Sequence, residues 1–102
     1  MGKWADYCIV GVHLSADRKW VERVRILPDT GDLLVTGLIM LRQQILTGIQ
    51  RGMTFTTALP DPLHMSYAKG QSVSIVTVDG VDYLRVDATP IAGDNLGNAP
   101  EF

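Results

Sequence analysis

The side chains in this sequence that are best suited to nucleophilic chemistry are Cys8 and His13, which lie five positions apart. A cysteine thiolate next to an imidazole is a common nucleophilic pair. On one regular strand, an odd separation places the two side chains on opposite faces, roughly 16 Å apart along the strand. We therefore expect Cys8 to be a buried, unreactive thiol and His13 to be an exposed strand residue.

A metal centre would need three or four ligands, and the sequence offers one cysteine, the histidines His13 and His64, and scattered carboxylates. It contains no phosphate-binding loop, no Gly-x-Ser-x-Gly, no Gly-x-Gly-x-x-Gly and no His-Glu-x-x-His. We therefore predict no catalytic residue, no metal and no cofactor, and favour a binding protein over an enzyme. Carboxylates from distant positions leave a small-molecule enzyme of unidentified chemistry open as an alternative.

Arginine side chains suggest a second kind of site. Arg23 and Arg25 project from one face of a predicted strand, with Tyr7 and Ile9 on the neighbouring strand. Basic residues among aromatic rings on an open sheet can bind single-stranded nucleic acid. The residues for this alternative are Arg23, Arg25, Arg42 and Arg51. Nine basic against eleven acidic residues give a net charge of −2, which argues against nucleic acid and for an ordinary solvated face.

A hairpin is predicted over residues 71–86, because Asp79-Gly80 between two apolar runs is typical of a type I′ turn. Counting outward from this turn, one face pairs Ile75 with Leu84 and is the natural core face. The opposite face is too apolar to be solvated, so the tail, a second copy or a ligand should cover it. The candidate partner or ligand surface comprises Val76, Val78, Val81, Tyr83, Arg85, His64 and Tyr67. Arg85 would pair with an anion, and Leu96 and Phe102 would dock there if the tail is the cover.

The elements that must position these residues are organised around a helix predicted from Leu38 to Gly52. Its apolar residues recur at helical spacing, at Leu38, Leu41, Ile45, Leu46, Ile49 and Met53. A helix of this length is marginal alone in water. Strands from both halves of the chain should therefore cover its apolar stripe.

A second hairpin is predicted from the strands at residues 6–14 and 19–27. A five-residue loop would place Val10 opposite Val24 and Cys8 opposite Ile26, whereas a four-residue loop would turn the apolar set outward. A bulge near Glu22 would remove that charge from the inner face. After the helix we expect a short strand at residues 53–59 and an irregular loop from Pro60 to Gly70.

These elements predict one α+β domain spanning residues 1–102. We expect a twisted antiparallel sheet of about five strands, in the order ββαβββ, with one helix packed on one face. The irregular tail at residues 87–102 should dock on this domain. A single cysteine excludes an internal disulfide. The absence of a signal-peptide pattern and of a long apolar run predicts a cytoplasmic protein without a membrane partner.

Several short stretches are similar to one known family. They are Ala5-Asp6-Tyr7-Cys8-Ile9, Arg42-Gln43-Gln44, Gly52-x-Thr54-Phe55-x-Thr57, Tyr83-Leu84-Arg85 and Asp94-Asn95-Leu96-Gly97-Asn98-x-Pro100-Glu101-Phe102. With these, the chain resembles the short bacterial proteins of the uncharacterised DUF3892 family over nearly its whole length. The resemblance implies no activity, but it implies that the tail is part of the domain.

Taken together, the sequence favours a small non-enzymatic binding or regulatory module of unknown ligand. Self-association as a homodimer is one way in which the outer face of the 71–86 hairpin would be covered. The partner is otherwise an unknown protein or small ligand, with single-stranded nucleic acid and small-molecule catalysis as the alternatives.

Overall fold

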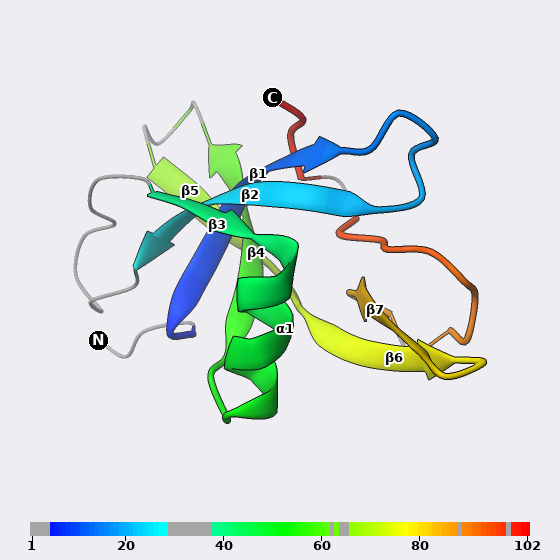
Figure 1. The fold of residues 1–102 in the computed structure, drawn as a ribbon. Coiled ribbons are helices and arrows are strands. Elements are labelled where there is room, and N and C mark those ends of the chain that lie inside the picture. The colour runs from blue at the N-terminus through cyan, green and yellow to red at the C-terminus, as the bar shows by residue number, and fades with distance from the viewer. Residues whose placement is uncertain (1–4, 29–37, 62, 64–65, 88, 98) are drawn as a thin grey trace.

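A computed structural model describes residues 5–28, 38–61, 63, 66–87, 89–97 and 99–102. These residues form seven strands and one helix (Figure 1). The elements are β1 (Tyr7–Leu14), β2 (Val21–Pro28), β3 (Leu38–Leu41), α1 (Arg42–Gln50), β4 (Phe55–Asp61), β5 (Ser66–Ser72), β6 (Ser74–Val78) and β7 (Val81–Arg85).

Five of the strands form one sheet in the order β3-β2-β1-β4-β5, and β6 and β7 form a separate hairpin. The expected α+β fold, with a five-stranded sheet and one helix, is confirmed. The predicted order ββαβββ is wrong, because the described elements follow the order βββαββββ and the 71–86 hairpin lies outside the five-stranded sheet. The sheet is mixed rather than wholly antiparallel, because β4 pairs with β1 in parallel from Tyr7↔Phe55 to Ile9↔Thr57. Placing α1 between β3 and β4 lets the chain cross over and return parallel to β1, which a tight turn cannot do.

The predicted helix from Leu38 to Gly52 is too long at its start. Residues Leu38–Leu41 are strand β3, which pairs antiparallel with β2 through Met40↔Val24 and Leu38↔Ile26. The helix begins at Arg42, where the Gln44 side chain accepts a hydrogen bond of 2.8 Å from the Leu41 backbone N–H. Sheet pairing therefore overrides helical spacing in the first four residues of the prediction. The rest of the helix is confirmed, and its buried residues include Ile45 and Leu46.

The predicted register of the first hairpin is wrong. Val12, rather than Val10, pairs with Val24, and Cys8 pairs with Leu27. Val10 is an extra residue between the pairs formed by Ile9 and Gly11, so the alternation of faces changes partway along β1.

The bulge expected near Glu22 is confirmed. His13 pairs with Arg23 and Leu14 pairs with Val21, which leaves Glu22 without an opposite residue. The Glu22 side chain is exposed. The charge therefore leaves the inner face at the cost of one irregular step in the ladder.

The irregular loop expected from Pro60 to Gly70 is also wrong. Strand β4 continues to Asp61, and β5 begins at Ser66, with Pro60 opposite Tyr67. A proline is tolerated here because β1 pairs with β4 only from Phe55 to Thr57. At Pro60 only one edge of β4 still has a partner strand, so the missing N–H need not break a ladder.

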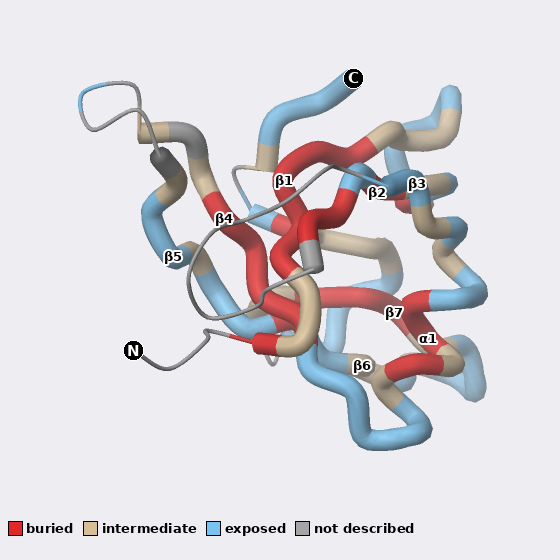
Figure 2. Tube along the Cα trace, turned by 90° about the vertical axis from the view of Figure 1, so that its left-hand side faces the viewer, coloured by how far each residue is buried: buried red, intermediate tan, exposed pale blue. Residues whose placement is uncertain are grey.

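Two apolar clusters fill the interior, and Figure 2 shows buried stretches along β1, β4 and β7. The larger cluster joins the sheet, α1, the hairpin and the tail through Ile9, Val12, Val21, Val24, Ile26, Ile45, Leu46, Phe55, Val73, Leu84 and Leu96. The smaller one comprises Cys8, Val10, Leu27 and Ala58, with Tyr67 packed against it. Both faces of β1 are therefore buried over part of its length.

The hairpin of β6 and β7 has the predicted register, from Ser74↔Arg85 to Val78↔Val81. Both turn residues have positive φ, 52° at Asp79 and 79° at Gly80, as a type I′ turn requires. Helix α1 contacts β2 and β3 on one side and β6 on the other. It therefore lies between the large sheet and the hairpin (Figure 1).

We expect the substitution Gly70→Ala to lower the free energy of unfolding by about 1–3 kcal/mol, as overpacking does. A Cβ atom at position 70 would lie 2.7 Å from the Thr57 carbonyl oxygen and against the Thr57 hydroxyl. Urea unfolding measures the change, and Ser72→Ala, at an exposed position of the same strand, is the matched control. Equal stability of the two variants would show that β4 and β5 do not approach this closely.

Candidate functional site

The carboxylate of Asp94 is the centre of a buried polar network. Its side chain has 0% exposed area and forms a bidentate ion pair with Arg42, with Nε–Oδ2 and Nη2–Oδ1 distances of 2.7 and 2.9 Å. It also accepts hydrogen bonds from the backbone N–H groups of Val21, at 2.8 Å, and Leu84, at 2.9 Å. Four donors therefore compensate one buried charge, which is the condition for such a charge to be tolerated.

Aromatic rings continue this network. The Arg42 guanidinium lies 4.7 Å from the centroid of the Trp20 ring, and the Trp20 ring stacks on Tyr83 with centroids 5.2 Å apart. Arg42 also donates a hydrogen bond of 2.7 Å to the Asp82 carbonyl oxygen. The stack joins the β1–β2 loop, the start of α1 and strand β7, so these residues serve the fold rather than a ligand.

Arg85 is a buried arginine. Arg85 forms an ion pair with Asp87, with an Nε–Oδ1 distance of 2.6 Å, and donates a hydrogen bond of 2.8 Å to the Gly93 carbonyl oxygen. Hydrogen bonding from Arg85 holds the pKa of the Asp87 carboxyl below its usual value of 3.8. The guanidinium of Arg85 is thus engaged within the chain.

The surface predicted on the outer side of the 71–86 hairpin is not one exposed patch. Tyr83 and Arg85 are buried, Val76 and Val78 are half-buried, and Val81 is exposed. Tyr67 is half-buried on β5 against the smaller apolar cluster, and His64 lies outside the described residues.

The tail runs along the edge of β7, where Asn95 bridges Arg85 in parallel. Leu96 is buried in the larger cluster with Leu84, on the core face of the hairpin, so the prediction that Leu96 docks on the outer face is wrong. The prediction that Phe102 docks there is also wrong, because its ring lies 3.0 Å from where a Cβ atom of Gly11 on β1 would stand. The ring of Trp20 takes the place on Tyr83 that was expected for the tail.

The last residues of the tail run along β1. Val12 donates a hydrogen bond of 2.8 Å to the Pro100 carbonyl oxygen, and Phe102 donates one of 2.9 Å to that of Val12. Strand β4 pairs with β1 only up to Ile9, and the tail pairs with β1 beyond that residue. Arg18 secures the segment through an ion pair of 2.8 Å with Glu101, and this interaction lowers the pKa of the Glu101 carboxyl.

This placement of Phe102 creates the surface that we call the arginine face, formed by Arg23, Arg25, Ile39, Leu41 and Phe102. The guanidinium carbons of Arg25 and Arg23 lie 4.7 and 6.0 Å from the centroid of the Phe102 ring. Ile39 pairs with Arg25 and Leu41 with Arg23 across β3 and β2, so all four side chains share one side of the sheet. Helix α1 packs on the other side, because Val24 and Ile26 point into the core with Ile45.

The charges of the arginine face are available to a partner. Within the described residues, no carboxylate forms an ion pair with Arg23 or Arg25. At its border, Nδ1 of His13 donates a hydrogen bond of 2.6 Å to the Phe102 main-chain oxygen, and its Nε2 lies 3.6 Å from Glu22.

The structure divides the residues predicted to bind nucleic acid. Arg23 and Arg25 share a face, Arg42 is paired with Asp94, and Arg51 lies at the end of α1. Tyr7 and Ile9, expected beside the arginines, point into the core, where the Tyr7 ring stacks on Phe55 at 5.3 Å. The extra residue Val10 in β1 explains this exchange of faces.

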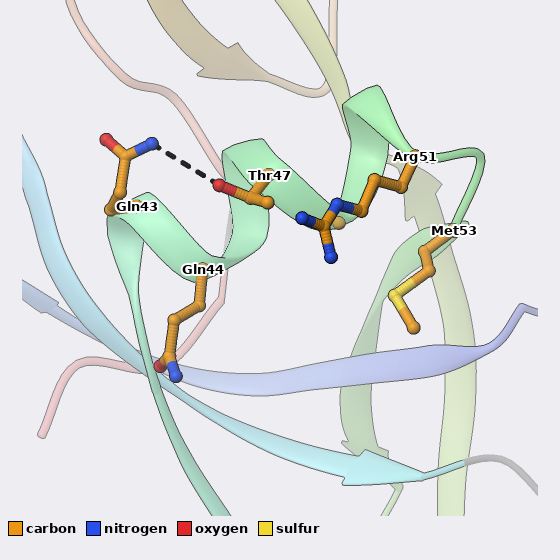
Figure 3. Close-up of a pocket in the computed structure, with 6 residues that line it drawn as sticks. Gln43, Gln44, Thr47, Arg51 and Met53 are labelled. Atoms are coloured by element: carbon orange, nitrogen blue, oxygen red, sulfur yellow. Dashed lines mark hydrogen bonds between the residues drawn. The ribbon is translucent and has the colours of Figure 1, made fainter.

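An open groove follows one side of α1. It has a volume of about 380 Å³ and is lined by Gln43, Gln44, Thr47, Gly48, Arg51 and Met53. Figure 3 shows the Arg51 side chain extending back along the helix beside Met53, and a hydrogen bond of 3.4 Å between Gln43 and Thr47. The lining of the groove is mainly apolar and carries one charge, that of Arg51. The groove is therefore a weaker candidate for a charged partner than the arginine face, which carries two.

The predicted burial of Cys8 is confirmed, whereas the predicted exposure of His13 is not. Cys8 is fully buried and forms no disulfide, whereas His13 is half-buried because the tail lies against it. Among the described ranges, no three cysteine, histidine or acidic residues are placed to hold a metal ion. In the same part of the chain, no helix has the length and apolarity needed to cross a bilayer.

Sequence reasoning missed the roles of Trp20 and Asp94 in this region, and it did not predict where the ring of Phe102 lies. The two that form the buried network are distant in sequence, and only the compact closing motif around Asp94 hinted at a structural role. The apolar residues Leu96 and Phe102 of the tail indicated docking, but not the strand on which Phe102 docks.

Comparisons with protein-family models, curated proteins and solved structures find no match for this chain. The resemblance to the DUF3892 proteins stays a prediction that depends on the stretches quoted for it.

We expect Asp94→Asn to lower the free energy of unfolding by about 3–5 kcal/mol, the usual cost of breaking a buried ion pair. The amide removes the charge that compensates Arg42 and turns an NH₂ group toward N–H donors. Urea unfolding measures stability, and near-ultraviolet circular dichroism reports the Trp20 stack. Glu101→Gln, which breaks an exposed ion pair, is the control and should leave both nearly unchanged. A mild effect of Asp94→Asn would contradict the central role of this carboxylate.

We expect Asp87→Asn to reduce the acid sensitivity of the fold. Arg85 lowers the pKa of Asp87 from 3.8, so this pair stabilises the native state above that pH and the contribution is lost as pH falls through the lower folded value. The wild type should therefore lose more stability than the variant between about pH 5 and pH 2. Thermal unfolding across this range tests it, and parallel pH profiles would disprove the contribution.

Proposed function

We propose that this protein is a small non-enzymatic binding module that takes an anionic partner on the arginine face. The observation that carries the proposal is the pair of guanidinium groups of Arg23 and Arg25 beside the Phe102 ring, with no carboxylate partner in the described residues. The other arginines of this region are engaged, since Arg18 pairs with Glu101, Arg42 with Asp94 and Arg85 with Asp87.

The distribution of charge supports an anionic partner in spite of the net charge of −2. Glu101, at the border of the face, forms an ion pair with Arg18, and Glu22 lies 3.6 Å from His13. Among the described residues, neither carboxylate forms an ion pair with Arg23 or Arg25. A local potential of this kind governs encounter with a charged partner more than the net charge does.

The chemistry of the face suits carboxylate or phosphate groups. Arginine offers a planar fork of donors that matches both anions, and a hydrogen bond to a charged group contributes about 1.5–3 kcal/mol. The Phe102 ring beneath Arg25 restricts that side chain before a partner arrives. Ile39 and Leu41, which are exposed on β3, add an apolar border to the same surface.

Single-stranded nucleic acid is the second candidate, and one observation favours it. An arginine stacked on an aromatic ring on the open face of a sheet is a platform on which bases can stack while phosphates bind neighbouring guanidinium groups. Phe102 is 38% exposed. Substitution of Phe102 by leucine should then weaken oligonucleotide binding and leave a simple polyanion unaffected.

The test measures fluorescence anisotropy of labelled poly-L-glutamate and labelled oligouridine at low ionic strength. We expect at least one probe to bind, and the double substitution Arg23→Ala, Arg25→Ala to weaken it tenfold or more, since two charged contacts are lost. Salt should weaken binding by the wild type. Arg51→Ala is the control, because Arg51 is exposed and lies on the helix at the opposite side of the sheet.

Failure of both probes to bind at low ionic strength would contradict the proposed function. An equal loss with Arg51→Ala would also contradict it, because binding would then follow total charge rather than this face. Unchanged melting temperatures of the variants ensure that folding does not cause the effect.

A further inference from the structure

The two edges of the large sheet differ in a way that points to a partner. Edge strand β5 has the sequence Ser-Tyr-Ala-Lys-Gly-Gln-Ser, with a lysine and a glycine in its interior. Edge strand β3 is Leu-Ile-Met-Leu, and its residues Leu38, Ile39 and Leu41 are 55%, 52% and 55% exposed. Proteins usually protect sheet edges with charges, prolines, bulges or very short strands. Strand β3 is short, with four residues, but it carries no charge and no proline, and within the described residues no strand pairs with its outer edge. An edge strand of this kind presents unpaired N–H and C=O groups.

The structure also shows which partner this edge would accept. On the outer side, β3 lies directly beside Arg25 and Arg23, through Ile39↔Arg25 and Leu41↔Arg23. A second copy that paired β3 with β3 would bring four uncompensated guanidinium groups to one surface, which like-charge repulsion disfavours. A strand that carries acidic side chains on this side would meet complementary charge.

We propose that an extended acidic peptide segment of a partner protein adds to β3 as a sixth strand of the sheet. This inference rests on the proposed function and names the partner class for the same face. Backbone hydrogen bonds to β3 supply affinity, and alternate side chains supply specificity, as in other cases of strand addition. On the added strand, one set of side chains lies beside Ile39 and Leu41, and the other beside Leu38 and Met40.

The arrangement requires the arginines to change direction. The added strand would lie two strand spacings from β2, about 10 Å, with β3 between them. The guanidinium groups of Arg23 and Arg25 lie over the Phe102 ring, which packs on Gly11 of β1, on the side of β2 away from β3. On binding, they would turn from this ring across the aliphatic surface of β3 to meet the glutamate side chains of the added strand. Acidic residues at every second position are therefore recognised on the outer side, and apolar residues between them cover Leu38 and Met40.

The experiment uses the full chain and a short peptide with blocked ends in which glutamate and valine alternate. Two analogues carry N-methyl groups on every second amide. In one analogue the methylated amides lie along one edge of the extended peptide, and in the other they lie along the opposite edge. All charges and side chains are kept. We expect the parent peptide to bind and at least one analogue to bind tenfold or more weakly, because methylation removes the donors that pair with β3.

A pair of substitutions separates strand addition from simple charge attraction. Ile39→Lys removes an apolar contact of β3 and adds a cation, so it should weaken peptide binding, whereas charge attraction alone would make it tighter. Ala68→Lys, at an exposed position of the β5 edge, is the control and should change binding little. Thermal unfolding of both variants verifies that they fold.

Other outcomes overturn the inference in distinguishable ways. If both N-methylated analogues bind as tightly as the parent, strand addition is wrong and the arginine face still binds anions. If oligouridine binds and the peptide does not, the partner is a nucleic acid. If light scattering shows a dimer that Ile39→Lys dissociates, a second copy occupies the edge. If no anionic probe binds, the proposed function fails as well.

Discussion

The ion pair between Asp94 and Arg42 is the interaction on which the arrangement of the other elements depends. A carboxylate with no exposed area is unfavourable unless its partners replace the water that it loses. Here the partners are the start of β2, strand β7 and the start of α1. The Asp94 backbone N–H adds a hydrogen bond to the Lys19 carbonyl oxygen, at 2.8 Å. One residue of the tail thus holds the large sheet, the helix and the separate hairpin together.

The tail that carries Asp94 also brings Phe102 to Arg23 and Arg25. Asp94 is fixed beside β7. After it, Leu96 is buried in the core, and residues 100–102 pair with the edge of β1. That edge is open beyond Ile9, because β4 no longer pairs with it. Gly11 leaves room for the Phe102 ring on the side of the sheet that carries Arg23 and Arg25. The same tail therefore pairs Asp94 with Arg42 and places Phe102 against Arg23 and Arg25.

Local patterns were sufficient to predict some of this structure. The type I′ turn at Asp79-Gly80 determines the register of its hairpin because the turn residues and the pairs are adjacent. The bulge at Glu22 followed from the cost of a charge on a core face. By contrast, the spacing of Leu38 and Leu41 fits a helix as well as an edge strand, and only the pairing with β2 decides between them. The bulge at Val10 has no local sequence marker, and Arg42 and Asp94 are 52 positions apart.

The treatment of strand edges links the fold to the proposed binding. The chain supplies its own short strand to the exposed part of β1, through Pro100 and Phe102, and gives β5 a polar sequence with Lys69. Both devices prevent unwanted pairing. At β3, three large apolar side chains remain more than half exposed next to Arg23 and Arg25, which form no ion pair with a carboxylate of the described residues. The partner strand that we propose would cover these side chains and meet the charge of the two arginines.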